Sequence, residues 1–365
     1  MDPLHDTVPD QSTDQSTDAS TDAAPEAGRL TTPVAGTVRW GLLAAGSIAR
    51  AMATAIRQSE GGRLVAVAAR DGQRAEAFAQ EHGIARSYEG YEALYADDEV
   101  DAVYISSTHP FHTEQALACL RAGKHVLIEK PLALTVHDTE LILETARERG
   151  VLAMEAMWTR CMPLVRDIVE RVRRGDIGTV RSCSASFTVP FDYDETHRLF
   201  DLANGGGALL DIGIYPVTLA HLLVGHPTDL MVLGSQAPTG ADDLVALQWM
   251  TADGAVAQVL CDSRSSGAAR TVVRGTEGWI EVHGPVNAPE SFTLHRGEDP
   301  EGEWVEGVQQ HYLHEVDEFH RCLREGLLES PLVPHADTVA IMTILESARR
   351  ELGVRYPQED EPLHT

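Results

Sequence analysis

Short apolar runs alternate with helical segments between residues 38 and 154, and this pattern constrains the fold more than any other feature of the chain. The runs fit strands, and the stretches between them carry Ala, Leu and Ile at helical spacing. Continuous apolar strands joined by helices form a parallel sheet that is covered on both faces. We therefore predict a doubly wound α/β domain over residues 37–155, with strands at Val38–Leu43, Leu64–Ala69, Ala102–Ser106, His125–Glu129 and Val151–Met154.

Two helices of this domain carry recognisable end signals. Glu114–Ala122 is stopped by Gly123. A second helix begins at Thr135, with Asp138 three residues on as a partner resembling a capping box, and ends at Gly150. These signals fix the helix ends because a side-chain oxygen caps the first N–H groups and glycine adopts the left-handed conformation that follows the last turn.

The pattern changes in the second half of the chain. In Arg181–Val189 apolar residues alternate with serine and threonine, as in a strand with one buried face. With a hairpin turn at Asp253-Gly254, four further strands predict an open, mainly antiparallel sheet: Leu244–Thr251, Ala255–Asp262, Thr271–Gly275 and Trp279–His283. Helical sequence returns at Tyr312–Glu325 and Ala336–Leu352. We assign residues 156–357 to a second α/β domain for substrate binding and oligomerisation, with its late helix (about 336–352) able to pack back on the first domain.

Composition narrows the classes of function. Residues 1–36 contain DQSTDQSTDASTDAAPEA and almost no large apolar side chains, which predicts a disordered acidic tail. A net charge of −27 argues against a nucleic-acid partner and an anionic membrane surface, and no apolar stretch reaches the roughly 20 residues of a membrane span. The five scattered cysteines include no C-x-x-C pair, so we expect reduced thiols in a cytoplasmic protein and no metal site.

A glycine-containing turn follows the first strand and opens a helix. A dinucleotide fingerprint needs small residues here, so that the backbone approaches a pyrophosphate at the helix N-terminus. In the G-x-G-x-x-[GA] register the positions are Ala44, Gly46 and Ala49, with Ser47 and Ile48 between them. Alanine replaces the first glycine of the fingerprint. Ala44 can take the place of this glycine only if the position needs no positive φ. The alternative is a plain tight turn.

The second strand ends in Arg70-Asp71. Sites for NAD place a carboxylate at this strand end, whereas the 2′-phosphate of NADP calls for an arginine. Because Arg70 comes first, the sequence favours NADP, with NAD as the alternative cofactor. The competing interpretation is a surface Arg–Asp pair that caps the next helix.

Lysine is almost absent from this chain. Lys124 and Lys130 are the only two, and Lys130 follows a strand in Ile128-Glu129-Lys130-Pro131. An ammonium is a compact point charge whose pKa moves on burial, which guanidinium does not offer. Carboxyl ends of parallel strands bind ligands, so we interpret Lys130 as functional. The alternative is a chance survivor on a loop.

The fourth strand is followed at the same edge of the sheet by Ser106-Ser107-Thr108-His109-Pro110-Phe111-His112. Together with Glu129-Lys130-Pro131 and Glu155-Ala156-Met157-Trp158-Thr159-Arg160, this segment resembles the glucose–fructose oxidoreductase/inositol dehydrogenase (Gfo/Idh/MocA) family, and within it the branch of dimeric dihydrodiol dehydrogenases and NADP-dependent D-xylose dehydrogenases. The resemblance spans about Val38 to Tyr356. It implies a Rossmann domain followed by an α/β domain with an open antiparallel sheet.

The resemblance also implies roles for these residues. Lys130 is expected to touch both nicotinamide and substrate, and Ser107, Thr108, His109, His112 and Glu129 are expected at the cofactor. Glu129 would support Lys130 or the nicotinamide ribose. For His112 the alternative is a helix N-terminal residue with no chemical task. Trp158 and Arg160 are expected to line the substrate pocket; the alternatives are a packing residue and a salt bridge.

A carboxylate four residues before an acid/base group is the remaining family element, and it matches Asp211 and Tyr215 after a triple glycine. Many members carry histidine where this branch has tyrosine. Tyr215 is expected to be the general acid/base, stabilised by Lys130, although the two roles can be exchanged; Asp211 would orient the substrate hydroxyl or Lys130. The alternative for Tyr215 is a core tyrosine. Because Pro216 is unfavourable inside a helix, we expect the helix to start near Tyr215, with Asp211 on the approaching turn.

The predicted function is therefore an NADP(H)-dependent oxidoreductase that acts on a secondary alcohol or carbonyl of a sugar, a polyol or a cyclic trans-diol. Two alternatives stay open. One is an oxidoreductase that keeps its cofactor bound and recycles it between two sugars. The other is a sugar- or nucleotide-sensing regulator without turnover, against which the combination of Lys130, Asp211 and Tyr215 argues. We also expect a homo-oligomer, a dimer or a tetramer, because the open sheet leaves one face that needs cover.

Overall fold

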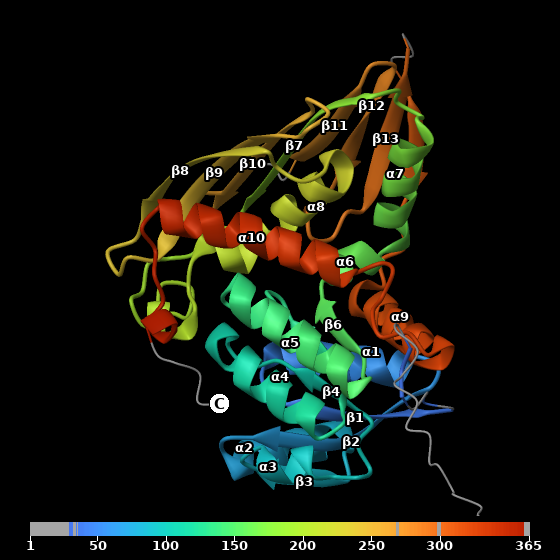
Figure 1. The fold of residues 1–365 in the computed structure, drawn as a ribbon, viewed down its shortest axis with the longest axis vertical. Coiled ribbons are helices and arrows are strands. Elements are labelled where there is room, and N and C mark those ends of the chain that lie inside the picture. Colours follow the sequence, from blue (N-terminus) through green and yellow to red (C-terminus); the bar gives the residue numbers. More distant parts are fainter. Residues whose placement is uncertain (1–28, 32–33, 35, 268–269, 298–300, 361–365) are drawn as a thin grey trace, which may run out of the picture.

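The computed structural model describes residues 29–31, 34, 36–267, 270–297 and 301–360. Its first sheet has six strands in the order β3-β2-β1-β4-β5-β6 (Figure 1). All five strand pairs are parallel. The strands are β1 (Val38–Leu43), β2 (Gly62–Ala69), β3 (Arg86–Glu89), β4 (Ala102–Ile105), β5 (His125–Glu129) and β6 (Ala153–Ala156).

Helices cover both faces of this sheet, as predicted. Residues of α1 (Ser47–Gln58) and α2 (Gly72–His82) share one core with the sheet. Residues of α3 (Glu92–Tyr95), α4 (His112–Arg121) and α5 (Val136–Arg149) share the core on the other face. The end signals of α5 are confirmed, since Thr135 accepts from the N–H of Asp138 at 3.1 Å and Gly150 is left-handed. The sequence missed β3, because this short strand is polar.

The second sheet has eight strands in the order β14-β13-β12-β11-β7-β10-β9-β8. Every pair is antiparallel except β10 with β7. The predicted open sheet is thus confirmed, although β8, β13 and β14 were not foreseen. In β8 the outward side chains Met231 and Leu233 are apolar, which hides the alternation typical of a half-buried strand. The strands are β7 (Val180–Thr188), β8 (Asp229–Gln236), β9 (Asp242–Met250), β10 (Val256–Asp262), β11 (Arg270–Gly275), β12 (Gly278–His283), β13 (Ser291–Arg296) and β14 (Glu303–Glu306).

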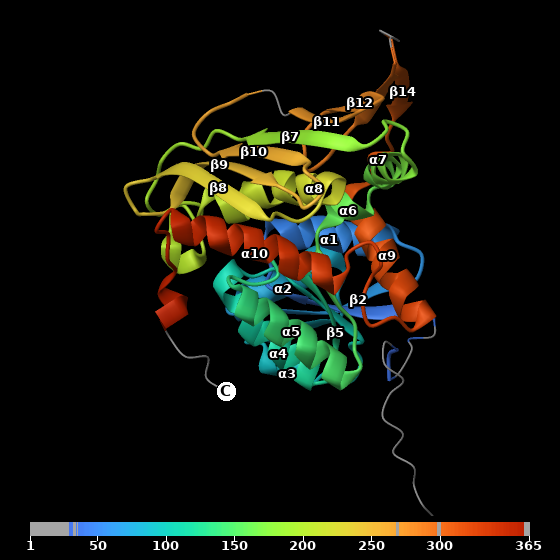
Figure 2. The same ribbon diagram turned by 45° about the horizontal axis from the view of Figure 1, so that its top comes forward.

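Helices fill the space between the two sheets (Figure 2). α8 (Ile214–Val224) packs on β7 and β10, and α10 (His335–Glu351) contacts both α8 and α5. α9 (His311–Glu325) packs on α1, next to α6 (Trp158–Cys161), from which α7 (Pro163–Arg174) continues. Helices from the C-terminal half therefore contribute to the core around the first sheet.

Most of the acidic segment predicted for residues 1–36 lies outside the described residues. At its end, however, Leu30 is buried and its N–H donates to the carbonyl of Gly326 at 2.9 Å. The N–H of Thr31 donates to the carbonyl of Gly150 at 3.0 Å. The folded chain thus begins before Val38, because one leucine in this polar segment finds an apolar contact.

One helical segment, Leu202–Val224, is long and apolar enough to cross a membrane by length and composition. Of its most apolar window, 83% is buried inside the protein, as in the core helix of a folded domain.

The turn between β1 and α1 departs from the sequence-based expectation. Ala44 has φ 76°, in the left-handed region, so the first fingerprint position does need a positive φ. An L-residue with a side chain is held there at a cost of about 1–2 kcal/mol. Hydrogen bonding fixes the turn, since the N–H of Ala44 donates to the carbonyl of Ala68 at 2.9 Å.

Ala44→Gly is therefore expected to stabilise the protein by about 0.5–1 kcal/mol, because relief of the left-handed strain exceeds the extra entropy of glycine in the unfolded chain. Urea unfolding measures the change. Ala77→Gly, on the exposed face of α2, is the matched control and should destabilise by about 1 kcal/mol. Equal destabilisation by both variants would contradict strain at Ala44.

Candidate active site

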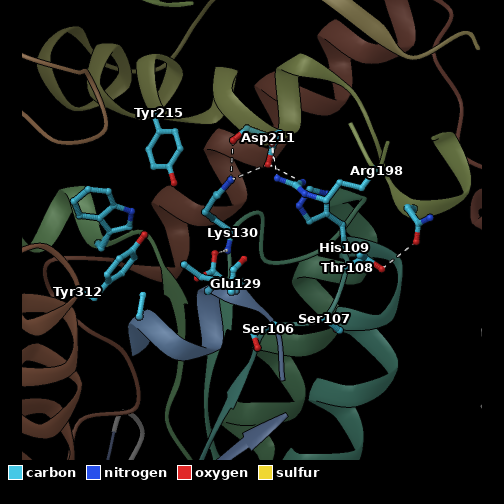
Figure 3. Close-up of a pocket in the computed structure, with 16 residues that line it drawn as sticks. Ser106, Ser107, Thr108, His109, Glu129, Lys130, Arg198, Asp211, Tyr215 and Tyr312 are labelled. Carbon is cyan, nitrogen blue, oxygen red and sulfur yellow. Dashed lines mark hydrogen bonds and ion pairs between the residues drawn. The ribbon is translucent and has the colours of Figure 1, made fainter. Parts of the chain in front are cut away.

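A cavity of about 550 Å³ lies where the carboxyl ends of β4 and β5 meet the start of α8 (Figure 3). Its lining comes from both halves of the chain: Gly46, Ser47, Ile48, Ala51, Ser106, Ser107, Thr108, His109, Glu129, Lys130, Trp158, Arg198, Asn204, Asp211, Tyr215 and Tyr312. A second cavity of about 570 Å³ shares four of these residues, Gly46 and Ser106 to Thr108, and extends to the end of β2. The two cavities together offer an elongated site at the strand ends.

Lys130 projects from the end of β5 toward the second half of the chain. Its Nζ donates to the backbone carbonyl of Asp211 at 2.7 Å and lies 3.4 Å from Oδ1 of the same residue. It also lies 5.1 Å from the ring centroid of Tyr215. Burial by itself lowers the pKa of Lys130, but the negative charges of Asp211 and Glu129, and of Tyr215 when it is ionised, outweigh this effect, so the pKa is raised. Lys130 is therefore a cation at neutral pH.

Asp211 is held between two cations. Besides Lys130, the guanidinium of Arg198 binds both carboxylate oxygens, Nη1 to Oδ1 and Nη2 to Oδ2, each at 3.1 Å. Burial opposes ionisation, yet Lys130 and Arg198 together hold the pKa of Asp211 well below its usual range. The carboxylate is thus ionised and its orientation is fixed.

Tyr215 lies on the other side of Lys130, with only 8% of its surface exposed. Its ring packs edge-on against Trp158, with centroids 6.5 Å apart, and against Phe187 at 6.0 Å. Burial raises the pKa of Tyr215, and Lys130 lowers it by less. Lys130 thus acts in the expected direction, but in the protein by itself burial prevails and the phenol is protonated at neutral pH.

The backbone that carries Asp211 and Tyr215 differs from the expected turn. Leu209–Gly213 forms a π-helical turn (η3) that continues directly into α8, so Asp211 is already helical. A regular α-helix would drive the ring of Pro216 against the carbonyl of Ile212. A π turn widens the backbone just before that point. The proline is accommodated without a break in the helix.

The triple glycine before this turn is required by close packing. A Cβ on Gly206 would lie 2.7 Å from the carbonyl oxygens of Arg198 and Leu199. Gly207 has φ 134°, and a Cβ there would collide with Oδ1 of Asp242. The other oxygen of that buried carboxylate accepts from the N–H of Leu209 at 2.6 Å. The glycines thus let the loop that bears Arg198 pack against the helix that bears Asp211.

The segment after β4 reaches across to the second half of the chain. Nδ1 of His109 lies 3.0 Å from the carbonyl of Gly205, and Oγ1 of Thr108 lies 3.4 Å from Oδ1 of Asn204. Ser107 lines both cavities and donates to Oε1 of Gln115 at 2.7 Å. These residues follow the end of β4 as the sequence predicts; all three line the first cavity, and Ser107 and Thr108 also line the second.

His112 and Arg160 lie elsewhere than expected. His112 is 0% exposed, and its ring nitrogens contact the carbonyls of Pro131 at 3.0 Å and Ser107 at 3.1 Å, so it joins the two strand-end loops and does not line the cavity. Arg160 donates to the carbonyl of Leu332 at 2.7 Å and to Asp337 at 2.5 Å. Arg160 lines a different cavity, together with residues of α7. Each residue makes the contacts of the structural alternative set out above, and its part in binding stays a prediction.

Glu129 and Trp158 do line the cavity. Glu129 accepts from the hydroxyl of Tyr104 and from the N–H of Lys130, the latter at 3.2 Å. Burial raises the pKa of Glu129. Its carboxyl group thus fixes the backbone at Lys130, which agrees with a supporting role.

The second cavity contains Arg70 and, in addition, Arg74. Asp71 accepts from the N–H groups of Gln73 at 2.9 Å and Arg74 at 3.3 Å, and so caps α2. Only Oδ1 of this carboxylate is used by the helix. The guanidinium of Arg70 lies 5.7 Å from the ring of Phe111 and is exposed. The strand end therefore offers two cations.

Sequence reasoning missed the lining residues Ala51, Ser106, Arg198, Asn204 and Tyr312, and also Arg74. Arg198 and Asn204 follow no strand-end pattern, since they lie in the long connection between β7 and η3. Tyr312 comes from α9, about 100 residues after the rest of the site. Only the spacing of Arg74, four residues after Arg70 on a predicted helix, offered a local signal.

A dinucleotide fits the geometry at the start of α1. Gly46 precedes this helix, a Cβ on it would meet nothing within 4 Å, and no side chain caps the first turn. The first N–H groups and the positive end of the helix dipole are therefore available to an anion.

Two family profiles match the chain. The profile described as "Oxidoreductase family, NAD-binding Rossmann fold" covers residues 38–157, and the "GFO/IDH/MocA C-terminal domain" covers residues 165–281. The chain belongs to the Gfo/Idh/MocA oxidoreductase family. It is therefore an oxidoreductase that uses a nicotinamide dinucleotide, and the family resemblance read from the strand-end motifs is confirmed.

Individual relatives agree with this membership. The chain is 36% identical over 334 residues to a trans-1,2-dihydrobenzene-1,2-diol dehydrogenase from Mus musculus, covering 88% of this chain and 99% of the relative. The human protein of the same name is 33% identical over 336 residues, with the same coverage. A solved 3-ketoreductase from Actinomadura kijaniata, in complex with NADP and TDP-benzene, has a TM-score of 0.77 and 28% identity, covering 88% of this chain and 99% of that one.

Proposed function

We propose that this Gfo/Idh/MocA protein transfers a hydride between NADP(H) and a secondary alcohol or carbonyl of a cyclic trans-diol, a sugar or a polyol. The observation that carries the proposal is the arrangement of Lys130 between Asp211 and Tyr215 in one cavity. The mouse and human relatives are named as dehydrogenases of a trans-diol, which supports a cyclic trans-diol as the substrate. An aromatic wall of Trp158, Tyr215 and Tyr312 suits the apolar face of a ring.

The residues divide the reaction between them. When bound, the nicotinamide accepts or donates the hydride. In the reductive direction Tyr215, protonated at neutral pH, donates its phenolic proton to the carbonyl oxygen. In the oxidative direction the phenolate takes the hydroxyl proton, and the ammonium of Lys130 stabilises the negative charge on either oxygen. Asp211 keeps Lys130 aimed at that oxygen.

Tyr215→Phe and Lys130→Met should each lower turnover by ~10²–10⁴-fold, because each removes the acid/base group or the cation that stabilises it. The oxidation rate is followed by reduced-nicotinamide absorbance, and NADPH binding by fluorescence should stay near that of the wild type. Tyr193→Phe, which removes a phenol outside the cavity lining, is the control. Near-normal turnover in both variants would refute the assignment.

A panel of aldoses, inositols and trans-dihydrodiols, assayed with NADP and with NAD, separates this proposal from its alternatives. Steady release of free NADPH supports a dehydrogenase. Turnover only when two sugars are present, with no free NADPH, identifies an oxidoreductase that recycles its bound cofactor. Ligand binding without turnover of any substrate identifies a sensor.

Preference for NADP over NAD is part of the proposal. Two arginines, Arg70 and Arg74, line the cavity at the end of β2, where Oδ1 of Asp71 caps α2. A 2′-phosphate would be bound by these two guanidinium groups, which supply more charge-assisted donors than the ribose hydroxyls of NAD can use.

The double substitution of Arg70 and Arg74 by alanine should raise the KM for NADP by about 10- to 100-fold, as expected for lost charge-assisted hydrogen bonds. The KM for NAD should change little. Arg57→Ala, an exposed arginine of α1, is the control for net charge. An equal loss with both cofactors would argue against a 2′-phosphate site.

A cytoplasmic homo-oligomer completes the proposal. All five cysteines are free and buried, which suits a reducing compartment. The outward face of the second sheet exposes large apolar side chains, led by Leu233 at 73% and Met231 at 66%. Clustered exposed apolar surface of this kind marks interaction sites, and a second copy of the same bare sheet face is the simplest partner of matching shape.

Leu233→Asp should therefore reduce the mass measured by light scattering to that of a monomer, because it places a charge in the apolar interface. Val308→Asp, at an exposed apolar position outside the sheet, is the matched control. An unchanged mass for Leu233→Asp, or a monomeric wild type, would contradict assembly through this face.

A further inference from the structure

Arg198 is a charged residue of the cavity whose task the proposed reaction does not explain. It lies on the connection between β7 and η3, its side chain is 52% exposed, and it lines the same cavity as Lys130. Its guanidinium points toward Asp211 from the side opposite Tyr215 (Figure 3). Exposure to the cavity leaves it accessible to a substrate.

The guanidinium of Arg198 has more hydrogen-bond donors than its contact with Asp211 uses. A guanidinium carries five N–H donors, and the described residues accept two of them, both at the carboxylate of Asp211. The bidentate pair fixes the plane of the group, because the two parallel bonds define its orientation. Three N–H groups of a preoriented guanidinium are therefore free for an acceptor in the cavity.

Its position relative to Lys130 defines which acceptor fits. Nη1 of Arg198 lies 3.1 Å and Nζ of Lys130 lies 3.4 Å from the same oxygen, Oδ1 of Asp211. Two cationic donors that flank one carboxylate oxygen suit two neighbouring oxygen atoms of one small molecule. The carboxylate between them can accept from a hydroxyl proton.

The side chains that line the cavity also suit a ring-shaped molecule that carries two neighbouring oxygen atoms. Trp158 contacts the rings of both Tyr215 and Tyr312 and forms an aromatic side with them. Thr108, which contacts Asn204, and Arg198 lie toward the other side (Figure 3) and are polar. A ring would therefore lie with its carbon face against the aromatic groups and its oxygen-bearing edge toward Arg198.

We propose that Arg198 is a specificity-determining residue, which binds the second oxygen of a vicinal diol while Lys130 and Tyr215 act on the first. This inference rests on the proposed function, since it assigns the role of Lys130. It explains how one carboxylate serves two cations: Asp211 sets the spacing between the donor for the reacting oxygen and the donor for its neighbour.

The test compares a vicinal diol with its mono-alcohol analogue, trans-cyclohexane-1,2-diol with cyclohexanol. Arg198→Met should lower kcat/KM for the diol by about 10- to 100-fold, mainly through KM, as expected when hydrogen bonds from a charged donor are lost. The value for the mono-alcohol should fall by a much smaller factor, because loss of the pair with Asp211 affects both compounds whereas loss of the second-oxygen contact affects only the diol. Arg198→Lys keeps a cation on Asp211 without the planar fork, and should fall between the wild type and Arg198→Met.

Arg264→Met is the matched control. Its guanidinium lies over Tyr193 and Phe200, 5.6 Å from each ring centroid, and it does not line the cavity. This variant should keep the preference for the diol. Thermal unfolding and NADPH binding establish that each variant is folded.

Calorimetric titration of the NADP complex with both compounds separates failure of this inference from failure of the proposed function. If turnover is absent but Arg198→Met weakens diol binding selectively, the inference stands and the proposed reaction falls. If Arg198→Met weakens both compounds equally, Arg198 acts only by pairing with Asp211 and the inference is overturned. Unchanged binding and kinetics in Arg198→Met overturn it as well.

Discussion

The contact between Lys130 and Asp211 is the interaction on which the rest of the site depends. It joins the carboxyl end of a parallel strand to the first turn of a helix from the other half of the chain. Removing an ammonium from water costs several kcal/mol unless hydrogen bonds and opposite charge replace the solvent. A backbone carbonyl and a carboxylate supply both. The cavity is built around the cation that these two groups keep charged.

Close packing in the second half of the chain positions the carboxylate of Asp211. The glycines at 206 and 207 allow a close approach that any side chain would prevent, and Asp242 holds the N-terminus of the helical turn. The π turn then runs directly into α8, which contains Pro216 without interruption. Asp211 and Tyr215 thus arrive on one rigid helix, which is the condition for a defined geometry at the reacting oxygen.

The cofactor side of the site combines a strained backbone turn with charged residues at a strand end. The fingerprint turn retains alanine in a left-handed conformation, and the surrounding hydrogen bonds hold it there. Local strain of this kind is characteristic of functional sites, where the fold as a whole determines the backbone. At the end of β2, Oδ1 of Asp71 caps α2, and Arg70 and Arg74 bring two cations to the site. Each part of the elongated site thus contains two cationic side chains beside carboxylates, within a protein of strongly negative net charge.

The sequence by itself determined the parallel sheet, the ends of α5 and the strand-end positions of Lys130, Thr108 and His109. These follow from periodicity and capping, which act over a few residues. It did not determine that Arg198 and Tyr312 would join the cavity, or that His112 and Arg160 would not line it. Such placements depend on contacts between residues far apart in the chain. The same holds for Tyr215, where tertiary burial outweighs the neighbouring cation and keeps the phenol protonated.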